Sequence, residues 1–303
     1  MTQTTDIDWL KTPDGVNRGY IKAEKLSELW IHTGTVCNLG CPFCFENSKP
    51  GDTRIELITF EEAKKYIDEA VELGIERFSF TGGEPFVNKD FFKILSYALN
   101  YRPCLVLTNG TGPIRTQLDD VIKLSKKPNK LKFRISIDHP DEIEHDKGRG
   151  KGTFALAVEM LSMLHQNGFS VSVARYGRLS EDKQAVENKF KDIFKTARLP
   201  ENTKLIVFYN LYKPNKSVDV PHITENCMTT YKDEKSRAEF MCAYSRMIVK
   251  KDGETGVYAC TLVDDDTRYN LAKTLRESID VKVMLGHHRC YSCFSAGTSC
   301  SEG

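Results

Sequence analysis

Between about residue 29 and residue 210, short runs of β-branched and aromatic residues alternate with longer runs of helical period. The first helical run begins at a capping box, in which the side chains of Thr59 and Glu62 each bond to the other residue's amide. Its apolar residues then recur at intervals of three and four until Gly74 ends the run. The same pattern predicts helices at residues 59–74, 90–100, 116–126, 153–167 and 181–197, and strands at residues 29–33, 75–81, 104–108, 131–138, 169–175 and 204–209.

Six strands joined by helices require parallel pairing with right-handed crossovers. Two arrangements satisfy this requirement: an open doubly wound sheet, or a barrel built from six (β/α) units instead of eight. Periodicity alone does not choose between them. Either way, the pattern predicts an α/β fold.

The alternation ends near residue 213, where Pro214, Asn215 and Pro221 interrupt a polar stretch. Six of the ten cysteines lie beyond this point. We therefore expect a lead-in at residues 1–25, a main domain at residues 26–213, and a small cysteine-rich α+β domain at residues 214–303. We expect this C-terminal domain to need a metal or cluster to complete its core.

Charge and composition restrict the class of protein. The chain has 43 Lys and Arg against 42 Asp and Glu, so it lacks the basic excess typical of a nucleic-acid binder. No apolar run approaches the roughly 20 residues that cross a bilayer, and residues 1–10 do not resemble an export signal. We expect a cytoplasmic protein, in which clustered cysteines bind metal more often than they form disulfides.

Three cysteines follow the first predicted strand in a C-x3-C-x2-C pattern: Cys37, Cys41 and Cys44. A closed zinc site requires four protein ligands, and no fourth lies nearby. An iron–sulfur cube held by three thiolates keeps one iron open for chemistry. The second strand is followed by the sequence TGGEP at residues 81–85, at a strand end where barrel sites are built. Its two glycines would let a ligand approach the backbone, and its glutamate offers a carboxylate to an ammonium group.

Together with residues 136–138 and 145–154, these motifs make the chain resemble the radical S-adenosylmethionine (radical SAM) superfamily over residues 29–210. The resemblance implies a partial (β/α)6 TIM-like barrel. It also implies a [4Fe–4S] cluster on Cys37, Cys41 and Cys44, whose open iron is chelated by the amino and carboxylate groups of S-adenosylmethionine. The implied cofactor-binding residues are Phe43 at the adenine, Gly82, Gly83 and Glu84 at the methionyl amine, Ser136 and Arg149 at the ribose and carboxylate, and Asn109 at the same barrel mouth.

In enzymes of this superfamily, one electron cleaves S-adenosylmethionine, and the resulting 5′-deoxyadenosyl radical abstracts a hydrogen atom from a substrate carbon. We expect a flavodoxin- or ferredoxin-type protein to donate the electron. Asp138 and Arg175, at strand ends, are candidate catalytic residues that touch substrate. Each is equally suited to a structural pair or cap, and the structural interpretation is favoured for Arg175.

The C-terminal cysteines form a second group. Asp252 and Gly253 predict a hairpin that brings Cys242 and Cys260 together, and a C-x2-C turn supplies Cys290 and Cys293. Four thiolates suit either structural zinc or a closed [4Fe–4S] cluster. The pattern resembles the twitch domain, a shortened relative of the SPASM domain, which implies one auxiliary [4Fe–4S] cluster. The six cysteines of residues 214–303 are too few for the two clusters of a full SPASM domain.

A complete ligand set on the auxiliary cluster favours an electron-accepting role, hence a two-electron oxidation of a peptide side chain or small polar metabolite. One alternative is a redox-neutral epimerisation in which Cys227 returns a hydrogen atom. Another is a non-catalytic, zinc-binding interaction protein. Cys300 is expected to be idle, and Cys104 to be a small buried hydrophobe. Only 36 residues precede Cys37, which disfavours a separate peptide-recognition domain and slightly weakens the peptide alternative.

Overall fold

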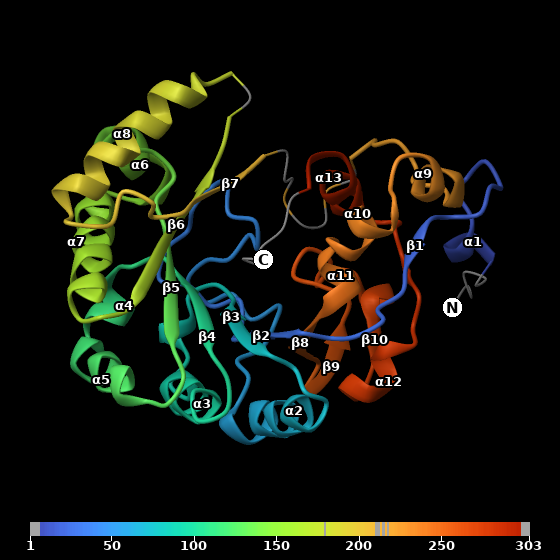
Figure 1. The fold of residues 1–303 in the computed structure, drawn as a ribbon, viewed down its shortest axis with the longest axis horizontal. Coiled ribbons are helices and arrows are strands. Elements are labelled where there is room, and N and C mark those ends of the chain that lie inside the picture. The colour runs from blue at the N-terminus through green and yellow to red at the C-terminus, as the bar shows by residue number, and fades with distance from the viewer. Residues whose placement is uncertain (1–6, 179, 210–212, 214–215, 217, 298–303) are drawn as a thin grey trace.

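The computed structural model describes residues 7–178, 180–209, 213, 216 and 218–297. Six parallel strands form its central wall, each hydrogen-bonded to the strand before it in the chain. Because the strand order never reverses, the wall is that of a partial barrel and not of a doubly wound sheet (Figure 1). The strands are β2 (Glu28–His32), β3 (Arg77–Thr81), β4 (Cys104–Thr108), β5 (Leu131–Ser136), β6 (Ser170–Tyr176) and β7 (Leu205–Phe208). All six strands expected from the sequence are confirmed.

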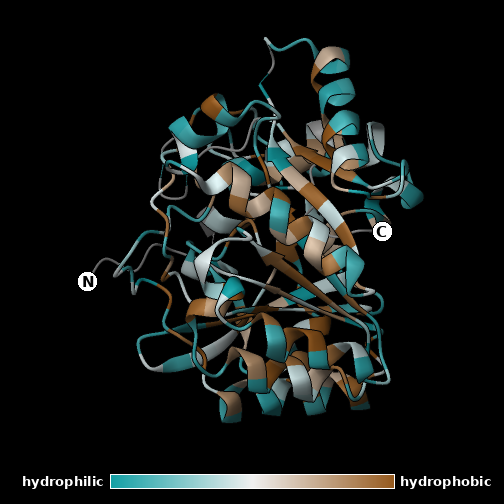
Figure 2. Cartoon of the chain, turned by 90° about the vertical axis from the view of Figure 1, so that its left-hand side faces the viewer, coloured by the Kyte–Doolittle hydropathy of each residue, from teal (hydrophilic) through white to brown (hydrophobic). Residues whose placement is uncertain are grey.

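Helices cover the outer face of this wall, and apolar residues concentrate along the strands (Figures 1 and 2). Both halves of the Thr59–Glu62 capping box are present. The helices are α2 (Phe60–Glu72), α3 (Phe91–Ala98), α4 (Gly112–Arg115), α5 (Leu118–Lys123), α6 (Glu142–Arg149), α7 (Thr153–Gln166) and α8 (Lys183–Thr196), with 3₁₀ turns at Pro85–Val87 and Leu124–Lys126.

Two helical segments differ from expectation. The helix expected at residues 116–126 is divided, because Gln117 leaves helical geometry between α4 and α5. Helix α6 was not predicted at all. His145 is its one buried residue, so it has no apolar stripe that a periodicity search detects.

The C-terminal region continues the same sheet. Strands β8 (Ser245–Lys251) and β9 (Glu254–Tyr258) form the predicted hairpin, and Asp252 and Gly253 take the positive φ values, 52° and 76°, of its two-residue turn. Strand β8 pairs in parallel with β2. The remaining elements are α9 (Glu225–Thr230), α10 (Glu234–Ala238), α11 (Met241–Tyr244), a 3₁₀ turn (Thr267–Tyr269), β10 (Asn270–Ala272), α12 (Leu275–Ile279), β11 (Val283–Met284) and α13 (His288–Ala296).

The segment expected as a lead-in contributes α1 (Ile7–Leu10) and β1 (Tyr20–Ile21). Strand β1 pairs antiparallel with β11, so the two ends of the described chain meet in one small sheet. Buried Arg18 reinforces this region by donating to the carbonyl oxygens of Trp9 and Lys11 at 3.0 and 2.7 Å. Among the described helices, none combines the length and the apolar character needed to cross a membrane.

Candidate functional site

A cavity of about 1090 Å³, including its open mouth, lies at the carboxyl ends of the parallel strands. It gathers most of the residues that the sequence singled out. Those on its wall are Cys37, Cys41, Phe43, Cys44, Gly82, Gly83, Asn109, Ser136, Asp138, Arg149 and Arg175. Glu84, Cys227 and the four C-terminal cysteines are not on this wall.

The first cysteine group, Cys37, Cys41 and Cys44, occupies the loop after β2. Two N–H groups point at the sulfur of Cys37: the Leu39 amide at 3.4 Å and the Asn109 side chain at 3.9 Å. Burial raises the pKa of Cys37 to about 12. A thiol buried in this way becomes a thiolate when a metal centre binds it, and the two donors suit a thiolate ligand.

The second cysteine group, Cys242, Cys260, Cys290 and Cys293, also comes together. The charges of Cys290 and Cys293 add to burial in raising the pKa of both Cys242 and Cys260, which requires the four sulfurs to lie near one another. Cys242 and Cys290 belong to one buried apolar cluster, and the partly buried Cys260 and Cys293 pack against it. The predicted hairpin therefore delivers its two cysteines to the C-x2-C turn of α13.

Thiolate ligands serve both zinc and iron–sulfur centres, so the type of ligand does not choose between them. Throughout the described chain, one set of three potential ligands has donor atoms within 4.8 Å of one another, and it contains no cysteine. What differs between the two cysteine groups is the number of thiols, three in the first and four in the second.

Gly82 and Gly83 allow two backbone segments to pack closely. A Cβ on Gly83 would lie 2.4 Å from the carbonyl oxygen of Val36, and one on Gly82 would lie 2.7 Å from that of Gly34. The amide of Gly83 donates to Gly34 at 2.8 Å. From the sequence, these glycines were expected to let a ligand approach the backbone. In the structure they line the cavity, but the atoms that exclude a side chain belong to the loop that carries the first cysteine group.

Glu84 lies behind the cavity wall. Its carboxylate accepts from Thr108 Oγ1 and the Asn109 amide, both at 2.8 Å, and from the Phe86 amide at 3.3 Å. Its burial raises its pKa to about 7, against the opposing effect of these hydrogen bonds. Through these hydrogen bonds Glu84 joins the β3 and β4 loops, and its contact with a cofactor amine stays a prediction.

Phe43 and Arg149 form one aromatic and charged wall. The Phe43 ring stacks on Tyr176, with ring centroids 6.3 Å apart, and the Arg149 guanidinium carbon lies 5.7 Å from the Phe43 centroid. Arg149 Nε pairs with Asp138, whose other oxygen accepts from the Tyr176 amide at 2.9 Å. Ser136 borders the same space at the end of β5.

The two strand-end candidates for catalysis are engaged by other protein groups. Arg175 binds Glu181 through both terminal nitrogens and donates from Nε to the carbonyl oxygen of Asp138 at 3.3 Å. Arg175 is 3% exposed. The structural interpretation favoured for Arg175 agrees with these contacts, and Asp138 serves as the partner of Arg149.

Cys227 does not line the cavity. It lies in α9, where its sulfur accepts from Thr224 Oγ1 at 3.2 Å, and it packs against the same apolar cluster as the second cysteine group. Cys104 is buried at the start of β4, as expected for a small hydrophobe. Cys300 lies outside the described residues.

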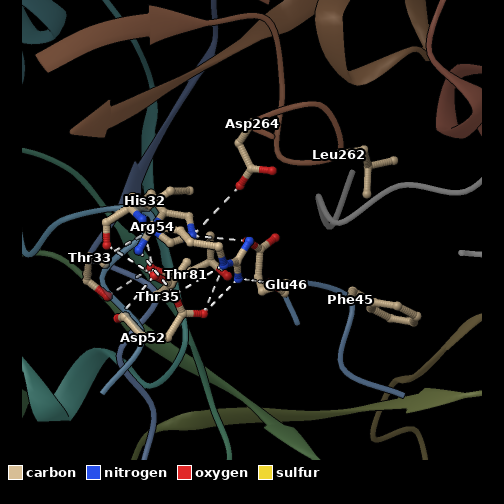
Figure 3. A network of polar contacts seen from close by, with 12 residues as sticks. His32, Thr33, Thr35, Phe45, Glu46, Asp52, Arg54, Thr81, Leu262 and Asp264 are labelled. Carbon is tan, nitrogen blue, oxygen red and sulfur yellow. Dashed lines mark hydrogen bonds and ion pairs between the residues drawn. The ribbon is translucent and has the colours of Figure 1, made fainter. Parts of the chain in front are cut away.

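Figure 3 shows a buried polar network, and its Glu46 also lines the cavity. The network could not be predicted from the sequence, because its members are far apart in the chain. His32 Nε2 faces Glu46 at 3.3 Å and Asp264 at 3.7 Å. His32 Nδ1 accepts from the Gly34 amide at 3.1 Å, so the proton of a neutral imidazole sits on Nε2. A metal at Nε2 would need the other tautomer, and this set is therefore a hydrogen-bonded junction and not a metal site.

A family model described as the Radical SAM superfamily matches residues 31–193, more than half of the chain. Three curated relatives are similar in sequence. The subtilosin biosynthesis protein AlbA of Bacillus subtilis is 34% identical over 46% of this chain and 30% of its own length. The mycofactocin maturase MftC of Mycolicibacterium smegmatis is 33% identical over 44% of this chain and 33% of its own length. The Fe-coproporphyrin III synthase of Methanosarcina barkeri is 31% identical over 63% of this chain and 45% of its own length. The chain spans less than half the length of these relatives.

Solved structures share the fold. SuiB of Streptococcus suis, bound to its precursor peptide SuiA, aligns with a TM-score of 0.63 and 14% identity over 86% of this chain and 66% of that chain. The protein anSMEcpe with bound AdoMet aligns with a TM-score of 0.57 and 16% identity over 84% and 80%. At these identities the likeness establishes the fold alone.

Replacing Gly83 by Ala is expected to displace the first cysteine loop, because the new Cβ meets backbone oxygen at 2.4 Å. We expect a loss of about 1–3 kcal/mol in the free energy of unfolding and a lower iron content on the first cysteine group. Gly112→Ala is the matched control, since a Cβ there has no neighbour within 4 Å. Urea unfolding and iron analysis measure the two effects. Equal values for both variants would show that the close packing is not required.

The buried Glu84 carboxyl predicts a pH-dependent stability. Its pKa of about 7 in the fold exceeds the roughly 4.3 of an unfolded chain, so its stabilising contribution is complete below pH 4 and is lost as the pH rises through 7. Glu84→Gln, which resembles the protonated form, should remove this dependence. The free energy of unfolding of both proteins is measured from pH 5 to 8. As the pH rises, the wild type should lose stability relative to the variant. A constant difference would contradict the prediction.

Proposed function

We propose, because this chain belongs to the radical SAM superfamily, that it is a radical SAM enzyme catalysing a two-electron oxidation of its substrate. Family membership implies a [4Fe–4S] cluster and S-adenosylmethionine. The residues for this cluster are Cys37, Cys41 and Cys44, which form a three-thiol set on the wall of the cavity. The net oxidation, and the second metal centre that it uses, are our proposal.

The gathering of Cys242, Cys260, Cys290 and Cys293 carries this proposal. Four thiolates complete the ligand set of a [4Fe–4S] cluster, which leaves no iron free to hold substrate. Such a centre, next to the cavity, is suited to accept an electron. Cys260 packs with Phe208 and Leu262, and both of those residues line the cavity.

When bound, the first cluster and S-adenosylmethionine supply the radical that removes a hydrogen atom from the substrate. An oxidation then requires the substrate to lose one more electron and one proton. The chain's contribution is to orient the substrate and exclude water. Phe45, Tyr176 and Phe208 form a continuous aromatic edge of the cavity, with centroid distances of 5.8 and 5.5 Å from Phe45 to the other two rings.

We favour a peptide side chain over a small polar metabolite as substrate. Two of the relatives are named for subtilosin biosynthesis and mycofactocin maturation, and one structural neighbour holds its precursor peptide. The reductant is proposed to be a flavodoxin- or ferredoxin-type protein, and the location cytoplasmic. Cys227 is not among the residues that line the cavity, which supports oxidation over the alternative in which Cys227 returns a hydrogen atom.

Cluster content tests the proposed centres. Reconstituted protein should contain ~8 Fe and ~8 sulfide per chain, as two cubes require. Replacing Cys37, Cys41 and Cys44 by Ala should leave about half of this, and so should replacing the four cysteines of the second group. Cys104→Ala, at an isolated buried thiol, is the control and should leave the content unchanged. A wild-type value near half of this content, with bound zinc, would exclude the second cluster.

Product mass tests the oxidation. With reductant and S-adenosylmethionine, the product of a candidate peptide should be two hydrogens lighter than the substrate. Cys227→Ala should leave turnover nearly intact. Cys290→Ala should stop product formation and still allow some 5′-deoxyadenosine, because the first cysteine group is untouched. A product of unchanged mass that gains one deuterium from D₂O would instead establish the redox-neutral alternative.

A further inference from the structure

One buried arginine contacts the loops of both cysteine groups. Arg289 lies in the first turn of α13, immediately before Cys290, and has no exposed surface. Its Nη2 donates to the carbonyl oxygen of Phe45 at 2.5 Å, and Phe45 directly follows Cys44. Its Nη1 donates to the carbonyl oxygen of Leu262 at 3.4 Å, two residues after Cys260. A single side chain thus touches the neighbours of ligands from both groups.

The surroundings hold this guanidinium in place. Burial raises the pKa of Glu46 and of Asp264, and the positive charge of Arg289 opposes this shift, which places both carboxyl groups near it. Figure 3 shows that Phe45 and Glu46, from the first cysteine loop, face the C-terminal segment that carries Leu262 and Asp264. Arg289 therefore lies in the junction between the barrel and the C-terminal region, and it also borders the cavity.

Two other arginines, the half-buried Arg149 and the buried Arg246, each serve one group. Arg149 lies beside the first group: burial raises the pKa of Cys41 and Cys44, and the charge of Arg149 opposes this shift. Arg246 lies beside the second: its Nη1 donates to the carbonyl oxygen of Cys242 at 2.7 Å, and its Nη2 to that of Ser278 at 3.0 Å. Among these three, Arg289 is distinguished by its contacts on both sides.

We infer that Arg289 is a positioning residue that fixes the two metal centres relative to each other and supplies both with one shared positive charge. The inference rests on the proposed function, which assigns a centre to each cysteine group. Reduction adds negative charge to a cluster. A cation beside the cluster stabilises this reduced form, and it does so more strongly in the protein interior than it would in water. The planar guanidinium can bridge two carbonyl groups at once, which the point charge of a lysine does less well.

The test uses the full-length, reconstituted protein and three variants: Arg289→Met, Arg289→Lys and Arg246→Met. Both cluster potentials are followed by electron paramagnetic resonance during a redox titration. Arg289→Met should move both potentials to more negative values. Arg246→Met, the matched control, should move the potential of the C-terminal cluster alone. Arg289→Lys should keep both potentials near wild type but lower the amount of product formed per 5′-deoxyadenosine.

The outcomes separate this inference from the proposed function. A shift of one potential or of neither in Arg289→Met, with two clusters present, would overturn the inference and leave the proposed function intact. An unchanged amount of product per 5′-deoxyadenosine in Arg289→Lys would also overturn the inference. This variant decides the question if Arg289→Met does not assemble both clusters. A wild-type protein with one cluster would overturn both, and iron analysis identifies that case before any variant is made.

Discussion

An open barrel of six strands cannot bury its own inner face, and this constraint organises the rest of the molecule. Trp30 of β2 and Leu105 of β4 belong to an apolar cluster whose other members come mainly from the C-terminal region, among them Met247 and Tyr258. The same cluster contains the second cysteine group. Strand β8 also hydrogen-bonds to β2. The same packing of the C-terminal region against the barrel therefore covers the inner face and brings the second cysteine group together.

The charged groups around the cavity are mostly bound to one another. Arg149 pairs with Asp138, and Arg175 pairs with Glu181. A buried pair of this kind contributes little net stability, but losing one partner leaves an uncompensated charge. What the cavity wall offers a bound molecule is therefore largely aromatic and uncharged surface.

The sequence predicted what depends on local pattern and left out what depends on distant segments meeting. The six strands, the Thr59–Glu62 capping box and the Asp252–Gly253 turn follow from spacing within a few residues. Helix α6 has no apolar stripe, so its polar sequence did not indicate a helix. The orientation of Glu84 toward the β4 loop, and the contacts of Arg289 with Phe45 and Leu262, depend on tertiary packing that no short motif encodes. The cysteine motifs were informative because metal chemistry restricts ligand type and spacing.

The pairing of β1 with β11 has a consequence for how the protein is made. Tyr20 bonds in register with Met284, and the parallel β2–β8 pair joins residues more than two hundred positions apart. Contacts of such sequence separation form slowly, because closing the long loop costs entropy before any packing is gained. During synthesis the cysteines of the first group emerge well before the strands that cover the barrel. The nascent chain thus exposes three thiols and an uncovered apolar face together, an interval in which protection from oxidation and aggregation falls to the cell and not to the fold.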